Sequence, residues 1–252
     1  MRAYQTISLE QRGRVARLTL TYAGGEPRIG PQLLGELADA CESIADSRDI
    51  YSVVVASAAA VFGSGWSADA LSAEATDLSH AFDCLAELPQ PVVAALHGEA
   101  SSAALELGLA CDVRIAGEGA KFSLPETAFG LIPLAGGAAR LGRAVGRASA
   151  IDLVLTGRAI DAAEALRMGL VSRVAPHSDL NDAALALAER IAERGPIATR
   201  YAKEAVNRGT GMTLEQALRF ETDLTVLLQT TYDRAEGVRA FLEKRRPKFE
   251  NR

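Results

Sequence analysis

Two glutamates lie in surroundings where a carboxyl group needs either a partner or a function. Glu106 lies in the apolar run "AALELGLA" (103–110), and Glu126 directly follows a proline in "SLPETAFG" (123–130). Proline favours the first turn of a helix, so we expect a helix to start near Glu126 and Glu106 to lie early in another. Two carboxyls that converge on one water can act as general acid and general base. Alternatively, each is an acid that the dipole of its own helix stabilises.

Two small-residue loops could supply a second kind of chemistry. "FGSGWSAD" (62–69) and "GEASSAAL" (98–105) each lead from a predicted strand towards a helix. Backbone N–H groups at such places are free to bind an oxyanion, and an oxyanion hole needs two of them aimed at one point. The N–H groups of Trp66 and Ala103 are the candidates. Ordinary strand-to-helix turns are the alternative interpretation for both loops.

The elements that would position these residues alternate between strand and helix. Continuous apolar runs predict buried strands at 50–57, 91–98 and 110–117, and helical spacing predicts helices at 31–46 and 77–88. This alternation favours a parallel α/β core, preceded by a hairpin of strands at 4–10 and 15–22. Further helices are predicted at 146–157, 161–169, 180–195, 196–209, 213–229 and 234–246. A Gly-Pro break divides the chain into residues 1–195 and a helical region, 196–252, whose Thr213 and Gln216 form a capping box.

Composition excludes several function classes. The chain of 252 residues has a net charge of −5, which argues against nucleic-acid binding. Its three cysteines and three histidines show no metal-ligand spacing, so we expect reduced thiols and no metal. The glycine-rich segment 130–146 lacks the lysine of a P-loop and is interpreted as a pocket wall. No signal peptide or membrane-length apolar stretch is evident, which favours a cytoplasmic protein without membrane contact.

The segments "VVAALHGEA", "ALELGLACDVRIAGEGAKFSLPETAFGLIPLAGGAARLGRAVG" and "LTGRAIDAAEALRMGLV" resemble the enoyl-CoA hydratase/isomerase (crotonase) family, and the resemblance covers essentially the whole chain. It implies an α/β crotonase-like spiral of β-β-α turns with a C-terminal helical region that builds trimers or hexamers. It also implies an acyl-CoA thioester as substrate and no cofactor beyond the CoA of that substrate. The implied roles are catalysis for Glu106 and Glu126, and oxyanion binding for the N–H groups of Trp66 and Ala103.

The resemblance further implies a set of residues that contact CoA or substrate. These are Pro27, Arg28, Ile29, Ser64, Gly65, Ser67, Ala68, Asp69 and, from a basic C-terminal arm, Lys244 and Lys248. The chain departs from the family pattern at three places. Ser102-Ala103-Ala104 replaces a glycine triplet, Ser67 replaces an aspartate that is lost or displaced to Asp69, and Pro27-Arg28-Ile29 replaces Asn-Ala-Leu. The indole of Trp66 is expected to line the acyl pocket.

The resemblance therefore implies an enoyl-CoA hydratase of fatty-acid β-oxidation or related metabolism. Such a hydro-lyase adds water across the 2,3 double bond of a 2-enoyl-CoA and yields a 3-hydroxyacyl-CoA. One alternative is an isomerase or another reaction of the family, which could run on Glu126 alone. The other is a weakly catalytic CoA-ester-binding protein, expected if the Cβ atoms of Ala103 and Ala104 fill the thioester position.

Overall fold

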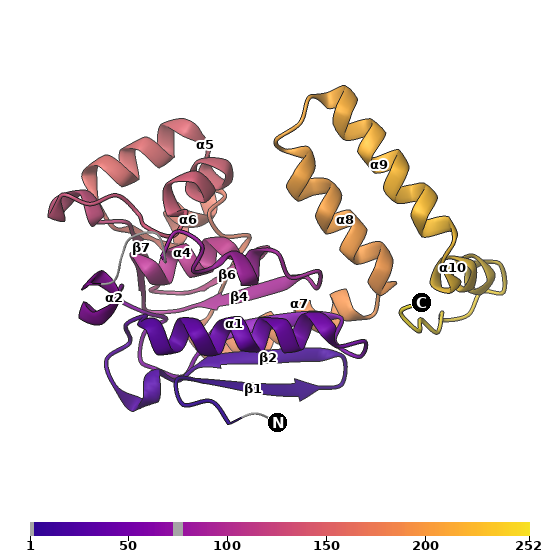
Figure 1. Cartoon of the computed structure of the whole chain (residues 1–252), viewed down its shortest axis with the longest axis horizontal. Coiled ribbons are helices and arrows are strands. Elements are labelled where there is room, and N and C mark those ends of the chain that lie inside the picture. Colours follow the sequence, from indigo (N-terminus) through magenta and orange to yellow (C-terminus); the bar gives the residue numbers. More distant parts are fainter. Residues whose placement is uncertain (1–2, 73–77) are drawn as a thin grey trace.

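A six-stranded sheet forms the centre of the computed structural model, which describes residues 3–72 and 78–252 (Figure 1). Its strand order is β1-β2-β3-β4-β6-β9, and only β1 and β2 pair antiparallel. The bounds are β1 Ile7–Arg12, β2 Val15–Leu20, β3 Ser52–Ser57, β4 Val92–Leu96, β6 Val113–Gly117 and β9 Arg173–Ala175. The predicted hairpin and parallel core are thus confirmed.

A second, smaller sheet is formed by short strands from successive parts of the chain. It has the order β5-β7-β8, with β5 Glu99–Ser101, β7 Lys121–Ser123 and β8 Ile160–Asp161. Helix α4 (Ala103–Ala110) follows β5, so β4, β5 and α4 form one β-β-α turn, and β6 and β7 with the helix after them form another. The fold is the predicted α/β crotonase-like spiral.

Helices cover both faces of the large sheet, which explains why its central strands read as continuous apolar runs. Helix α7 (Leu180–Ala192) packs on β3, β4 and β6, with Ala184 and Ala188 in one buried cluster with Val54 and Val93. The larger cluster contains residues of the remaining core helices. Their bounds are α1 Pro31–Asp46, α2 Ala68–Ser72, α3 Asp83–Ala86, α5 Gly137–Thr156 and α6 Ala162–Met168.

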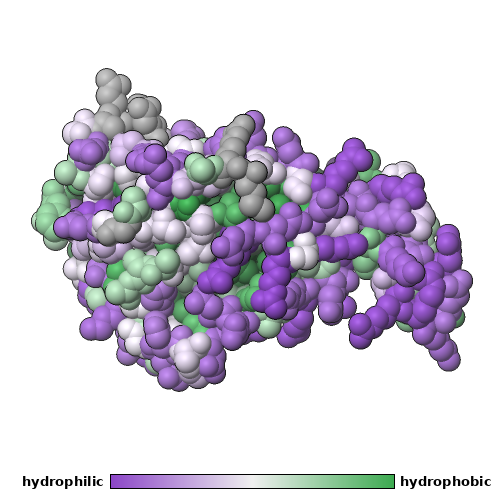
Figure 2. Space-filling view, turned by 90° about the horizontal axis from the view of Figure 1, so that it is seen from below, coloured by the Kyte–Doolittle hydropathy of each residue, from purple (hydrophilic) through white to green (hydrophobic). Residues whose placement is uncertain are grey.

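Three C-terminal helices extend from one side of this core (Figure 1). They are α8 Pro196–Gly209, α9 Leu214–Gln229 and α10 Tyr232–Leu242, and the predicted Thr213–Gln216 capping box opens α9. Figure 2 shows mostly hydrophilic residues over this region when the molecule is seen from below. Nevertheless, large apolar side chains on these helices are exposed, including Leu214, Phe241 and Leu242. Apolar surface of this kind is typical of an interface with another chain.

Several predicted elements differ from the structure in their bounds, including the strand predicted at 110–117, which begins at Val113. The helix expected at 77–88 is reduced to the four residues of α3, and Asp77 lies outside the described residues. The helix expected to begin at Gly146 is the second half of α5, which is interrupted there by a non-helical conformation (φ 78°, ψ 161°). Strand β1 begins at Ile7 rather than at residue 4. Within the described parts of the chain, no helix is both long and apolar enough to cross a membrane.

Candidate active site

The loop that carries Trp66 is joined to the segment after β2 by backbone hydrogen bonds. Ile29 N donates to Gly65 O at 2.8 Å, and Ser67 N donates to Ile29 O at 2.9 Å. These two bonds, made by the residues on either side of Trp66, form a parallel bridge between Trp66 and Ile29. In such a bridge the N–H of Trp66 points away from Ile29. Among the described residues the Trp66 N–H has no acceptor, as an oxyanion donor requires.

The loop that carries Ala103 lies directly against the Trp66 loop. A Cβ built on Gly65 would lie 3.3 Å from Ser102 Cβ, and one built on Gly63 would lie 2.7 Å from Ala104 Cβ. Glycines at 63 and 65 therefore allow the two loops to approach closely. Since Ala103 is the first residue of α4, its N–H has no acceptor within the helix. The two predicted oxyanion donors thus come from adjacent loops.

Ser102 accommodates the turn into α4 with an unusual backbone conformation. Its φ is 52° and its ψ is −129°, a region that favours glycine, whereas Ala103 and Ala104 are helical. Ser102 N donates to Ser123 O at 3.0 Å, and Ser102 O accepts from Glu106 N at 3.0 Å. Of the three positions where the family pattern has glycine, only Ser102 therefore requires glycine-like freedom.

Glu106 is fully buried in α4, and only one of its carboxyl oxygens is occupied. Oε2 accepts the Ala135 N–H at 2.5 Å, whereas Oε1 has no partner among the described residues. Burial raises the pKa of Glu106 to about 7. The Ala135 N–H opposes this rise, the nearby Glu126 carboxyl adds to it, and Arg140 opposes it. Both protonation states of Glu106 are therefore accessible near neutral pH.

Glu126 opens a short 3-10 helix, Glu126–Phe129, after Pro125. Its side chain is also buried, and neither carboxyl oxygen has a hydrogen-bond partner among the described residues. The Thr127 hydroxyl donates to Val154 O at 2.9 Å and anchors this turn on α5. Buried polar atoms are normally paired, so the free oxygens of Glu106 and Glu126 indicate a place for a bound polar molecule.

The side chain of Trp66 packs against the α3 region. It is 4 % exposed and stacks on Phe82, with ring centroids 5.8 Å apart. Its indole Nε1 has no acceptor among the described residues. The indole is therefore part of the packing that supports the loop, and its predicted place along an acyl pocket stays a prediction.

The structure brings together the predicted CoA-contacting residues of the two N-terminal loops. Pro27 O accepts from Ser64 N at 2.8 Å, and Arg28 Nη1 donates to Trp66 O at 3.3 Å. Ala68 and Asp69 follow in α2, whose Ala70 N–H donates to the Ser67 hydroxyl at 3.3 Å. Arg28, Ser67 and Asp69 border a surface hollow of about 350 Å³. These loops, Pro27 to Ile29 and Ser64 to Asp69, thus form one continuous surface.

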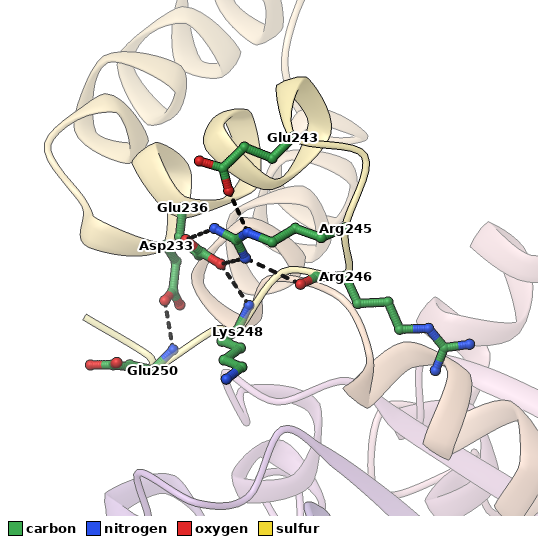
Figure 3. A network of polar contacts seen from close by, with 7 residues as sticks. All are labelled: Asp233, Glu236, Glu243, Arg245, Arg246, Lys248 and Glu250. Carbon is green, nitrogen blue, oxygen red and sulfur yellow. Dashed lines mark hydrogen bonds and ion pairs between the residues drawn. The ribbon is translucent and has the colours of Figure 1, made fainter.

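The C-terminal segment is fixed to α10 by two buried acids (Figure 3). Glu236 accepts from Arg245 Nη1 at 2.5 Å, from Arg245 Nη2 at 2.9 Å and from Lys248 N at 2.9 Å. Asp233 accepts from Glu250 N at 2.7 Å. The Arg245 hydrogen bonds lower the pKa of Glu236 to about 2. The segment therefore has a defined course.

This course keeps Lys244 and Lys248 away from the other predicted site residues of the same chain. Arg14 Nη2 donates to Phe249 O at 3.2 Å, and Asn251 Nδ2 donates to the backbone oxygen of Arg48 at 3.0 Å. Arg14 directly precedes β2, whereas the Trp66 loop follows the carboxyl end of the neighbouring parallel strand β3. A six-residue strand spans about 20 Å. The C-terminal segment that follows α10 and carries Lys244 and Lys248 is thus bound at the opposite end of these strands from the Trp66 loop, and Figure 1 shows the C-terminus on the side of α8 and α10.

Ala135, Gly137 and Arg140 are residues of the site that sequence reasoning did not identify. A Cβ on Gly137 would lie 2.7 Å from Glu106 Cγ, so the backbone approaches the carboxyl directly. Their signal in the sequence is the Gly-Gly pair of "PLAGGAAR", which by itself indicates only a pocket wall. No group of three or more His, Cys, Asp or Glu within the described residues is arranged to hold a metal ion.

Comparison with known proteins shows the family to which the chain is similar. The sequence model of the Enoyl-CoA hydratase/isomerase family matches residues 11–252. A probable enoyl-CoA hydratase of Mycobacterium bovis is 40% identical over 99% of both chains. The 2,3-dehydroadipyl-CoA hydratase of Escherichia coli is 37% identical over 95% of this chain and 96% of its own. The crystal structure of an enoyl-CoA hydratase from Bacillus anthracis matches with a TM-score of 0.94 and 35% identity, covering 98% of this chain and all (100%) of the other.

The match runs through both carboxyl-bearing turns and both donor loops, since it extends over nearly the full length of the chain. The similarity of the fold to a solved enoyl-CoA hydratase leads to the same family as the sequence comparison. This chain belongs to the enoyl-CoA hydratase/isomerase family.

Proposed function

We propose that the chain is an enoyl-CoA hydratase that converts a 2-enoyl-CoA into a 3-hydroxyacyl-CoA, as the names of its relatives suggest. The observation that carries this proposal is the pair of buried carboxyls with unpaired oxygens, Glu106 Oε1 and both oxygens of Glu126. A buried carboxyl without partners is costly, and a water held between the two would relieve that cost. The site requires no cofactor beyond the CoA carried by the substrate.

In the proposed reaction, the thioester carbonyl oxygen lies between the N–H groups of Trp66 and Ala103. These donors stabilise the negative charge that develops on this oxygen when water attacks C3. One carboxyl accepts a proton from the attacking water, and the pair returns a proton to C2. The π bond between C2 and C3 and one O–H bond of the water are broken, while a C–O bond at C3 and a C–H bond at C2 are formed, and the pair of glutamates carries the same number of protons after the reaction as before it.

The pKa of Glu106 suits this exchange. A group with a pKa of about 7 is populated in both forms near neutral pH, which favours transfer of a proton in either direction. The Ala135 N–H restrains Glu106 through Oε2, so Oε1 is the oxygen available to the water. We assign Glu106 and Glu126 as the acid–base pair on this basis.

The altered small-residue loop leaves room for catalysis in this proposal. Ala104 Cβ faces Gly63 in the wall between the two loops. Its methyl group therefore fills space between the loops, which argues against the premise of the binding-protein alternative that the Ala104 Cβ fills the thioester position. Ala103 retains its N–H, so both oxyanion donors remain.

Binding of CoA and assembly complete the proposal. We propose that residues 27–29 and 64–69 contact the CoA part of the substrate. Residues 196–252 would form a separate helical region that assembles trimers or hexamers, consistent with the exposed Leu214, Phe241 and Leu242. Lys244 and Lys248 would then serve the site of a neighbouring protomer. A cytoplasmic location remains part of the proposal.

The test is the loss of conjugated-enoyl ultraviolet absorbance when the purified protein meets a short 2-enoyl-CoA. Glu106→Gln and Glu126→Gln are each expected to lower kcat by about 10²-fold or more, because each removes a proton-transfer group. Glu118→Gln, which alters an exposed glutamate, is the matched control and should leave the rate unchanged. Near-full hydration by either buried variant contradicts the mechanism. Conversion of a 3-enoyl-CoA without any hydration would instead support the isomerase alternative.

A further inference from the structure

A chain of polar contacts links Glu106 to the surface of the molecule through Arg140. Arg140 Nη1 donates to Ala135 O at 2.7 Å, and Arg140 Nη2 donates to Asp83 Oδ1 at 2.7 Å. The N–H of the same Ala135 donates to Glu106 Oε2 at 2.5 Å. The backbone at Ala135 is thus bound by Arg140 at its carbonyl and by Glu106 at its amide.

The two glycines that follow Ala135 show how tightly this backbone is enclosed. A Cβ on Gly136, whose φ is +83°, would lie 2.9 Å from Arg140 Nη1. A Cβ on Gly137 would lie 2.8 Å from Glu106 Oε1 and 2.7 Å from Glu106 Cγ. The guanidinium therefore lies over one glycine and the carboxyl over the next, with no side chain between backbone and either charged group.

We propose that Arg140 and Asp83 are positioning residues for Glu106. Arg140 fixes the 135–137 backbone, and this backbone holds Oε2 of Glu106 so that Oε1 stays directed towards the water. Asp83 holds the second arm of the guanidinium and thereby orients the first. This inference rests on the proposed function, because it assigns a reason for the orientation of a group in the proposed acid–base pair.

The charges around Glu106 agree with this role. Burial raises its pKa, the Ala135 N–H lowers it, Glu126 from the 3-10 helix raises it, and Arg140 from α5 lowers it. The Leu134 N–H also lowers it. Arg140 therefore acts on Glu106 both through Ala135 and directly through its charge, and its removal should leave Glu106 more basic.

Asp83 is well suited to keep Arg140 in place. It accepts from His80 Nδ1 at 2.5 Å as well as from Arg140, and these two hydrogen bonds lower its pKa, the His80 bond most strongly. Asp83 therefore stays ionised and paired with the guanidinium. A charge-assisted pair with two defined partners restrains a long side chain better than a single exposed contact does.

The experiment measures the titration of Glu106 itself, in the protein without ligand. The infrared C=O band of the protonated carboxyl is assigned by its loss in Glu106→Gln and followed against pH. The variants are Arg140→Met, Arg140→Lys and Asp83→Asn. Arg143→Met is the matched control, since Arg143 is an exposed arginine of the same helix whose guanidinium donates one hydrogen bond, to Ala139 O, among the described residues. The kcat and KM for a short 2-enoyl-CoA are measured alongside.

Arg140→Met is expected to raise the pKa of Glu106 by about one pH unit, because an opposing cation and a backbone restraint are lost. It should lower kcat about ten- to hundredfold, with KM within about threefold of the wild-type value. Arg140→Lys keeps the charge, so the pKa of Glu106 should lie between its wild-type value and its value in Arg140→Met. Arg143→Met should change neither the pKa of Glu106 nor kcat.

An unchanged titration midpoint of Glu106 in Arg140→Met overturns the inference, even if activity falls, because a purely structural role would lower activity alone. If Arg140→Met does not fold, Arg140→Lys and Asp83→Asn decide. If the titration midpoint of Glu106 and kcat are unchanged in both of these variants, the inference is overturned. A shifted Glu106 midpoint in either variant supports it. A wild-type protein that shows the Glu106 band but no hydration contradicts the proposed function, while the band still reports whether Arg140 positions Glu106.

Discussion

Replacing Ser102 by glycine should stabilise the protein, because Ser102 has a backbone conformation that suits glycine. Its φ of 52° and ψ of −129° are imposed by hydrogen bonds to Ser123 O and from Glu106 N. The Ser102 hydroxyl contributes no hydrogen bond within the described residues, so little is lost with the side chain. Strain of this kind costs about 1–3 kcal/mol. Glycine relieves it but gains about 0.4–1 kcal/mol of unfolded-state freedom.

The net gain expected for Ser102→Gly is therefore roughly 0.5–2 kcal/mol in the free energy of unfolding. For a chain of this size, Tm rises by about 2–4 °C per kcal/mol. The assay is urea-induced unfolding with a thermal scan beside it. Ser102→Ala is the control, since it removes the hydroxyl but keeps the Cβ and should show no comparable gain.

Two results would refute this reasoning about Ser102. A Ser102→Gly protein that is less stable than the wild type would show that the turn is not strained. An equal gain in Ser102→Ala would show that the hydroxyl, rather than the backbone, is the source of the cost. Because the Ala103 N–H is retained in both variants, hydratase activity should survive in each.

Three further outcomes are expected. Gly137→Ala should displace the Glu106 carboxyl, since the added Cβ would meet Glu106 Cγ at 2.7 Å, and kcat should fall at least tenfold, whereas Gly142→Ala in the same helix has open space and should not change kcat. The folded pKa of Glu106 is raised from 4.5 to about 7, so the free energy of unfolding should decline as the pH rises from 4.5 to 7. Urea titrations of Glu106→Gln should show less of this decline. The folded pKa of Glu236 is lowered from 4.5 to about 2, so its contribution is complete above pH 4.5 and is lost as the pH falls towards 2. The protection of the residue 245–252 amides against hydrogen exchange, corrected for the intrinsic exchange rate at each pH, should therefore fall over that range, and Glu236→Gln should show reduced protection already at pH 7.

The fold was largely predictable because hydrophobic periodicity reports burial directly. The continuous apolar runs at β3 and β4 correctly indicated parallel strands covered on both faces. The length of α3 was not predictable, since turns at 78–82 and helical residues share the same apolar spacing. The break at Gly146 was mistaken for a helix start, because glycine punctuates a helix in either case.

The site was predictable at the level of residue types but not of partners. Glu106 was identified from a carboxyl in an apolar helix, yet its hydrogen-bond partner, Ala135, lies 29 residues further on. Every residue type except proline carries the same backbone N–H, so the sequence gives no sign of which N–H binds Glu106. The strain at Ser102 and the packing of Trp66 on Phe82 likewise arise from tertiary contacts between loops. Long-range geometry of this kind depends on how the sheet brings the loops together.

The order of strands in the large sheet has a consequence for how the protein is made. Spatial order β1-β2-β3-β4-β6-β9 is also chain order, so each strand can add to an edge already formed as synthesis proceeds from the N-terminus. Until β6 is synthesised, the growing edge is β4, whose five residues are all buried in the finished protein. An apolar open edge of this kind is a template for pairing between chains. Nascent or truncated chains that end between Leu96 and Val113, like those that end between Ser57 and Val92 and expose β3, therefore present an apolar edge that favours aggregation.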